Sequence, residues 1–288
     1  MSALWWAFSN LFFAATNDLV FKGYARKTRS QGLFASIIGV IWLGALLTLV
    51  KRPPENWGAT LIWGAISGVF SIGGNLLMLD AMKKLDAGVC ATIYRLNLVP
   101  AVILAALILG ESISWIQYAG IGCACLAVVA FLPEKSSVRS QMSVGLIVMI
   151  AASLMRAGMG ISYKYGFSHG ADEDVVPVIN SLFWIIGGIV YAVIREREIL
   201  KDLKTDRDNV RKLFAYGLGS GVLVAGIVLT MAKSLAGGNA SVVLPIMQMS
   251  FLVTGVLSVI FLKEMVTVKK VAALLFGVAA VLLLSIKF

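Results

Sequence analysis

The sequence has few charged residues for a chain of 288 residues. Asp, Glu, Lys and Arg make up 14% of it, whereas soluble proteins contain about 25%. Hydrophobic residues make up 59%, compared with roughly 45–50% in soluble domains. A soluble core has no use for this excess of apolar side chains. The composition therefore excludes an ordinary soluble protein and indicates that much of the surface contacts lipid.

Residues that bind metals or act as nucleophiles are also scarce. The single histidine, His169, falls in a loop between two apolar segments. The sequence has no HExxH motif and no pair of acids in the middle of an apolar segment. We therefore predict a protein that is not an enzyme, with no catalytic residues, no metal site and no cofactor. The cysteines lie inside apolar segments and lack the spacing of a metal or redox motif: Cys90, Cys123 and Cys125.

Acidic residues are outnumbered by basic residues, 15 to 25, and the formal net charge is +10. The basic residues lie in short loops between apolar segments, as in membrane proteins whose loops contact anionic lipid headgroups. This pattern predicts a lipid bilayer as partner and no binding of nucleic acid.

The apolar residues fall into segments with about the 20 residues that a membrane-spanning helix needs. The connections are short except for the charged segment 195–212, which we expect to be a solvated linker or a short surface helix. We predict an all-α integral membrane protein with ten transmembrane helices, at residues 3–21, 32–50, 59–82, 88–109, 114–132, 143–166, 175–194, 213–235, 239–261 and 267–286.

The second half of the chain repeats the first. Residues 74–132 align without a gap with residues 227–285, and this alignment places Glu111 on Glu264. Five helices per half is an odd number, so the two halves enter the membrane in opposite senses. Such inverted repeats (5+5) are typical of secondary transporters with a central cavity. The predicted units are a first repeat, a linker and a second repeat: 1–132, 133–142 and 143–288.

The distribution of basic residues between the two sets of loops predicts the orientation. One set, which includes the segment 195–212, contains eighteen Lys and Arg residues, and the other contains five. Positively charged loops stay in the cytoplasm, so both termini are predicted outside. We expect a multi-pass protein of a bacterial inner (plasma) membrane.

Two similar segments resemble the drug/metabolite transporter superfamily, EamA type. They are Ala91-Thr92-Ile93-Tyr94-Arg95-Leu96-Asn97-Leu98-Val99-Pro100, running to Glu111, and Ser241-Val242-Val243-Leu244-Pro245, running to Glu264. The resemblance implies a 5+5 bundle, alternating access and a cavity lined by the first, third, fourth, sixth, eighth and ninth helices. Relatives in this superfamily transport amino acids, other small metabolites, sugar phosphates and nucleotide sugars. Some relatives keep their termini in the cytoplasm, opposite to the orientation that the charges predict.

Two arginines lie deep within predicted helices, where a charge costs about 2.5–3.5 kcal/mol. Arg95 lies about 10 Å from the start of the fourth helix, and Arg156 lies about 15 Å from the nearer end of the sixth. Arg95 nearly reaches the headgroups along its own stem, so a structural role is an open alternative. Arg156 lies near the middle of an apolar layer ~30 Å thick and must face a wet cavity or pair with an acid. Both are predicted to bind substrate.

Other polar residues occur within the apolar segments, and we expect them to line the cavity or to form hydrogen bonds between helices. Asp18 and Asp80 lie about one turn from the ends of predicted helices, so proton coupling competes with helix capping or an ion pair to a nearby lysine. Tyr163 and Trp184 either line the cavity or pack in the core. The remaining cavity candidates are Asn17, Asn75, Tyr94, Asn97, Asn180, Gln248 and Ser250.

The planar guanidinium group suits carboxylate and phosphate ligands. With two deep arginines and no acid at comparable depth, we predict a secondary transporter for a small polar metabolite with a carboxylate or phosphate group, first an amino acid or organic acid. The alternative within transporters is a carrier or exporter of a cationic, choline-like or drug-like molecule, which requires a deep carboxylate. A membrane-embedded enzyme and a non-transporting scaffold are the rival classes, and both a monomer and a homodimer fit the sequence.

Overall fold

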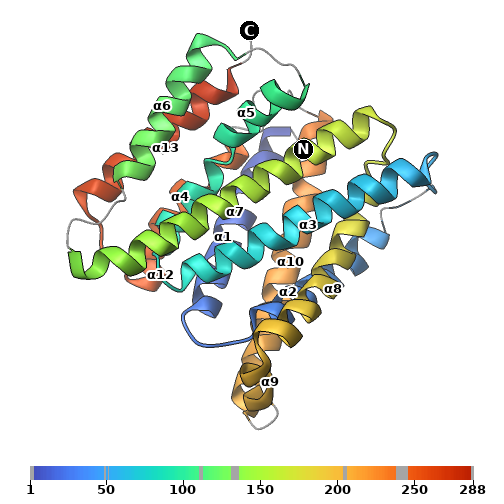
Figure 1. Ribbon diagram of the computed structural model, residues 1–288, viewed down its shortest axis with the longest axis horizontal. Coiled ribbons are helices and arrows are strands. Elements are labelled where there is room, and N and C mark those ends of the chain that lie inside the picture. The colour runs from blue at the N-terminus through green and yellow to red at the C-terminus, as the bar shows by residue number, and fades with distance from the viewer. Residues whose placement is uncertain are drawn as a thin grey trace.

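The computed structural model describes residues 3–48, 50, 52–109, 113–130, 136–203, 206–237 and 246–286. These residues form helices and short connections and contain no β-strand, as predicted. Figure 1 shows the helices, which are α1 (Ala3–Ala25), α2 (Gln31–Leu47), α3 (Trp57–Met82), α4 (Ala87–Arg95), α5 (Leu98–Leu109), α6 (Trp115–Ala130), α7 (Ser136–Ser168), α8 (Val175–Arg195), α9 (Arg197–Leu203), α10 (Arg207–Gly237), α12 (Ser250–Leu262) and α13 (Val268–Ser285).

Five helical segments are long and apolar enough to cross a membrane, counting only the described residues: Trp57–Met82, Ala87–Ile108, Ser143–Ser168, Val175–Arg195 and Arg207–Met231. Shorter apolar helices occur at Gln31–Leu47, Trp115–Ala130 and Ile246–Leu262. The chain is therefore a multi-pass membrane protein. Several predicted features fall partly outside the described residues: the start of the ninth helix at 239–245, the start of the linker at 133–135, Ser241–Pro245 and Glu111.

The fourth predicted helix, 88–109, agrees with the apolar span Ala87–Ile108, but the helix is interrupted within this span. α4 ends at Arg95 and α5 begins at Leu98. Pro100 cannot donate a backbone hydrogen bond to the carbonyl four residues earlier, so the regular ladder is lost there. The side chain of Asn97 instead donates to the backbone carbonyl three residues before it (2.8 Å). Arg95 consequently lies at the carboxyl end of a helix, where the helix dipole stabilises a positive charge.

Two other boundaries differ from the prediction. The sixth predicted helix, 143–166, is longer, because α7 begins at Ser136, inside the predicted linker 133–142. Within the charged segment 195–212, α9 is a short surface helix with no buried residue. This observation selects one of the two alternatives that the sequence left open.

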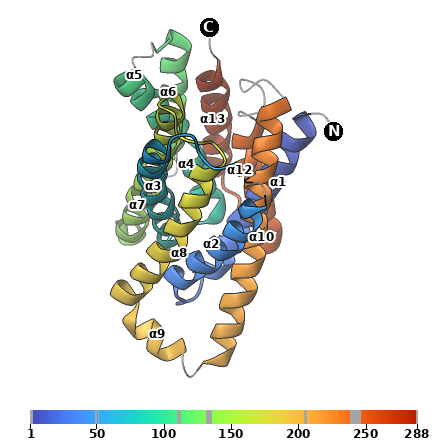
Figure 2. The same ribbon diagram turned by 90° about the vertical axis from the view of Figure 1, so that its right-hand side faces the viewer.

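α1 packs on α10, α3 packs on α7 and α8, and α4 packs on α12. α2 packs between α8 and α10, while α6 and α13 pair at one edge of the bundle (Figure 1). The start of α1 and the end of α13 lie at one end of the bundle and α9 projects at the other (Figure 2). Large apolar side chains such as Leu107 and Trp115 are exposed on the outer faces, where lipid covers them.

α2 and α8 cross in close contact at two glycines. A Cβ atom at Gly32 would lie 2.3 Å from the carbonyl oxygen of Gly188, so only glycine fits there. Near this crossing, the buried carboxylate of Glu196 accepts hydrogen bonds from the Ser30 hydroxyl (2.7 Å) and from the backbone N–H groups of Gln31 (2.9 Å) and Gly32 (3.2 Å). The acid after α8 thus satisfies donors at the amino end of α2, where a negative charge is also favoured by the helix dipole.

Replacing Glu196 with Ala is expected to lower the free energy of unfolding by about 2 kcal/mol, because buried donors at the amino end of α2 lose their acceptor. Unfolding of the purified protein in mixed micelles measures this change. The control is Glu198→Ala, since Glu198 is exposed and pairs with Lys201 within α9, and we expect less than about 0.5 kcal/mol for it. Equal losses for the two variants would contradict the assignment.

Candidate functional site

A cavity with a volume of about 160 Å³ lies within the bundle. We call it the central cavity. Its wall is formed by α1, α2, α3, α4, α7, α8, α10 and the residues just before α12. Its apolar part includes Phe21, Trp42, Met78 and Val228, and its polar part is formed by Asn10, Asn17, Asp18, Ser71, Asn75, Tyr94, Arg95, Arg156, Tyr163, Trp184 and Gln248.

The structure distributes the predicted site residues over three places. On the wall of the central cavity lie Asn17, Asp18, Asn75, Tyr94, Arg95, Arg156 and Gln248, together with Tyr163 and Trp184. Behind the wall, Ser250 and Asn180 form hydrogen bonds to Arg95 and Tyr163, while Asn97 bonds to the backbone of α4. On the surface, Asp80 pairs with Lys83 (3.1 Å). The Asp80–Lys83 pair is the alternative that competed with a coupling role for Asp80. Direct substrate contacts of Asn97, Asn180 and Ser250, which lie behind the wall, stay predictions.

Arg95 is neutralised by an acid on another helix. Its Nη2 atom lies 3.6 Å from Oδ2 of Asp18, and its Nε atom donates to the hydroxyl of Ser250 (2.7 Å). The hydroxyl of Thr254 donates to the same carboxylate oxygen of Asp18 (3.0 Å). The guanidinium group also lies over the ring of Tyr94, 5.7 Å from its centre. Arg95 is thus held by side chains from α1, α4 and α12.

This pair corrects the prediction that no acid lies at the depth of the two arginines. α1 continues to Ala25, so Asp18 lies about two turns inside the helix. Only 3% of its surface is exposed. The predicted position was shallower because the predicted helix, 3–21, ended four residues earlier. The buried ammonium group of Lys22, within α1, donates to the backbone carbonyls of Met82 (2.7 Å) and Leu85.

Arg156 has no such neutralising partner. No carboxylate in the described part of the chain lies within ion-pair distance of its guanidinium group. Its Nη1 atom contacts the sulfur atom of Met159 (3.4 Å), and the charge interacts electrostatically with the phenol groups of Tyr94 and Tyr163. Of the two alternatives for a deep arginine, the structure therefore selects the one in which the side chain faces a cavity.

Buried hydrogen bonds connect the wall of the cavity to α8. The amide nitrogen of Asn180 donates to the hydroxyl oxygen of Tyr163, and the hydroxyl of Ser67 donates to the amide oxygen of Asn180 (3.0 Å). The indole N–H of Trp184 donates to the hydroxyl of Ser71 (2.9 Å). These bonds fix side chains of α3, α7 and α8 relative to one another.

The sequence analysis missed Asn10, a polar residue of the cavity wall. Its amide donates to the carbonyl of Ile227 (2.6 Å) and to the hydroxyl of Thr230 (3.1 Å). The signal was its spacing, because residues seven apart lie on the same face of a helix. Asn10 precedes Asn17, which was selected, by seven positions.

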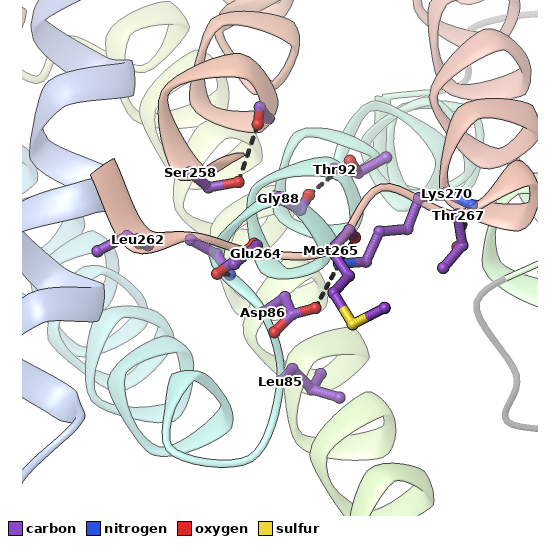
Figure 3. A network of polar contacts seen from close by, with 12 residues as sticks. Leu85, Asp86, Gly88, Thr92, Ser258, Leu262, Glu264, Met265, Thr267 and Lys270 are labelled. Atoms are coloured by element: carbon purple, nitrogen blue, oxygen red, sulfur yellow. Dashed lines mark hydrogen bonds and ion pairs between the residues drawn. The ribbon is translucent and has the colours of Figure 1, made fainter. Parts of the chain in front are cut away.

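The start of α4 is joined by polar contacts to the connection between α12 and α13 and to the start of α13 (Figure 3). A carboxylate oxygen of Glu264 accepts the backbone N–H of Ala87 (2.8 Å), and Lys270 pairs with Asp86 (2.5 Å). Phe21 of the cavity wall is followed along α1 by Tyr24, whose ring stacks on that of Phe34 at 4.1 Å.

Comparison with known proteins gives a family match over nearly the whole chain. Residues 1–132 and 143–286 match the EamA-like transporter family. An uncharacterized protein of Methanocaldococcus jannaschii is 33% identical over 108 residues, which cover 37% of this chain and 78% of that protein. A solved crystal structure of a protein shares the fold, with a TM-score of 0.61 and 14% identity over 98% of each chain.

Neutralising one member of the Arg95–Asp18 pair is expected to destabilise the protein more than neutralising both. Asp18→Asn or Arg95→Gln leaves an uncompensated buried charge, which costs about 3 kcal/mol, and the double variant loses less than either single variant. Unfolding free energies of the three variants in mixed micelles measure the coupling. Asp80→Asn is the control, because Asp80 and Lys83 form an exposed pair and we expect less than about 1 kcal/mol. Additive effects at Asp18 and Arg95 would show that the pair is not an energetic unit.

Proposed function

This chain belongs to the EamA-like transporter family, and we propose that it moves a small metabolite bearing a carboxylate or phosphate group across the membrane. Membership in the family makes it a secondary transporter, with a small-molecule substrate and a bilayer around it, and not an enzyme. The observation that carries the proposed substrate class is the unneutralised charge of Arg156 on the wall of the central cavity.

The charges of the cavity wall favour an anionic group. Asp18 and Arg95 cancel one another at 3.6 Å, and Arg156 adds a positive charge that no described carboxylate balances. A charge at membrane depth is costly without a counter-ion, so a bound anion lowers the energy of the site. The guanidinium group offers two parallel donors to a carboxylate or a phosphate.

The size and the neutral polar groups of the cavity favour a small metabolite. Its volume of about 160 Å³ is less than the roughly 300–1,000 Å³ of pockets for drug-sized ligands. The amide groups of Asn17, Asn75 and Gln248 both donate and accept hydrogen bonds. An amino acid or an organic acid is therefore our first substrate class.

A cationic substrate is the weaker alternative. It needs a carboxylate that is free to bind it, but the carboxylate of Asp18 already receives Arg95 and the hydroxyl of Thr254. A cation in the cavity is also repelled by Arg156. These contacts support an anionic ligand over a choline-like ligand.

We further propose that the two halves of the chain are inverted copies that provide alternating access. In this repeat α1 corresponds to α7, α3 to α10 and α5 to α12. The packing supports the correspondence, because α1 packs on α10 as α7 packs on α3, and α1 packs on α12 as α7 packs on α5. Two further pairs of corresponding helices, α2 with α8 and α6 with α13, pack directly on each other. Exchange of such equivalent contacts opens a cavity first to one side and then to the other. In this proposal the chain ends are outside and α9 is cytoplasmic.

Arg156→Ala is expected to abolish substrate-induced thermal stabilisation and transport, because the anion loses its counter-ion. Purified protein is tested by thermal shift against L-amino acids, carboxylic acids, phosphate esters and choline, and the compounds that bind are then tested for counterflow in proteoliposomes. Arg156→Lys keeps the charge but loses the planar fork, and it should weaken binding by at least about tenfold.

Arg197→Ala is the matched control, because Arg197 is an exposed arginine of α9 and the variant should behave as the wild type. Two results would refute the proposed substrate class: stabilisation by choline but by none of the anions, or full stabilisation of Arg156→Ala by the same anion.

A further inference from the structure

We propose that the hydroxyl group of Tyr163 is a second hydrogen-bond donor of the anion site, and that Asn180 sets the direction of its proton. This inference rests on the proposed function and deepens it. It names the neutral group that, together with Arg156, recognises an oxygen atom of the carboxylate or phosphate.

Tyr163 and Arg156 belong to the same face of the same helix. They are seven residues apart on α7, which corresponds to about two turns, and both line the central cavity. The guanidinium group contacts the sulfur atom of Met159, which lies between them along α7. Arg156 is therefore directed toward Tyr163, and an electrostatic interaction joins the two side chains. A single small anion between them can contact both.

The hydrogen bonds behind Tyr163 determine which way its proton points. Asn180 is completely buried, and its amide oxygen lies 3.0 Å from the hydroxyl of Ser67, which shares its proton between this oxygen and the carbonyl of Gly64 (3.2 Å). The amide nitrogen of Asn180 then donates to the hydroxyl oxygen of Tyr163. A phenol has one proton to donate and also accepts. Since Asn180 fills an acceptor position of the Tyr163 oxygen, the proton of Tyr163 remains available to the cavity.

Among the described residues, the Tyr163 hydroxyl has Asn180 as its hydrogen-bond partner, and in that bond the phenol oxygen accepts. The proton of Tyr163 therefore has no acceptor in this part of the chain. An oxyanion bound in the cavity would accept this hydrogen bond from Tyr163. Hydrogen bonds from O–H to a charged oxygen are short and about twice as strong as neutral ones. The arrangement Ser67–Asn180–Tyr163 thus turns a neutral side chain into an oriented donor for an anion.

The test uses the full-length protein with sodium acetate and sodium phosphate as minimal carboxylate and phosphate probes, each compared with sodium chloride at equal ionic strength. Dissociation constants are obtained from thermal shifts as a function of probe concentration. Tyr163→Phe removes the hydroxyl and keeps the ring, and we expect binding to weaken roughly tenfold. Tyr165→Phe is the control on the same helix, because Tyr165 packs on Trp63 outside the central cavity; it should leave the affinity unchanged.

Asn180→Leu tests the direction of the proton. It removes the amide that donates to the Tyr163 oxygen and adds no charge, so the proton is no longer directed into the cavity, and binding should weaken by part of the loss seen in Tyr163→Phe. The double variant should bind the probes as Tyr163→Phe does, because Asn180 acts through the hydroxyl that Tyr163→Phe removes. Unchanged binding in Asn180→Leu, or additive losses in the double variant, would refute the proposed role of Asn180.

The outcomes separate this inference from the proposed function. If Arg156→Ala loses the probes while Tyr163→Phe binds them as the wild type does, the role of Tyr163 is refuted and the anion site stands. If neither probe stabilises the wild-type protein more than chloride does, the anion site itself is refuted. A purely structural role for Tyr163 predicts a lower melting temperature without ligand and an unchanged dissociation constant, and this result also counts against the inference.

Discussion

The ion pair between Arg95 and Asp18 determines the electrostatic character of the cavity. A buried arginine without a counter-ion is strongly destabilising, and this one obtains its partner from a different helix. Ser250 and Thr254 hold the pair from α12, so its geometry depends on the packing of α1, α4 and α12. Because the pair has no net charge, the positive charge of Arg156 on α7 is the one that remains available to the ligand that we propose. The selectivity that we propose follows from this division of roles between two arginines.

Polar groups at the ends of the helices also obtain their partners from neighbouring helices. Glu196 and Glu264 both follow a helix and both accept backbone N–H groups at the start of another one, α2 and α4 respectively. Lys22 does the converse and donates to carbonyls near the end of α3. Backbone groups at helix ends cannot remain unsatisfied within a membrane. Side chains of neighbouring helices therefore complete one another's hydrogen bonds, and few charged residues suffice to hold the bundle together.

The helical class, the apolar segments and the depth of Arg156 were predictable, because they depend on composition and on the rise of a helix. The partner of Arg95 was not, because it required knowing that α1 continues beyond Asp18 to Ala25. The break after Arg95 had a visible cause in Pro100, but its position depends on how Asn97 folds back onto the chain. The hydrogen bond between Asn180 and Tyr163 joins residues seventeen positions apart on two helices. Such contacts follow from tertiary packing, which the periodicity of one chain does not encode.

The interruption between α4 and α5 has a mechanical consequence. A continuous helix resists bending because every turn is tied to the next, whereas a missing hydrogen bond makes one point of the rod compliant. This soft point immediately follows Arg95, where α4 packs mainly on α12 and also on α7, while α5 packs mainly on α7. The two segments thus differ in their main neighbour. In the alternating access that we propose, this point lets α4 and α5 change their relative tilt beside the ion pair.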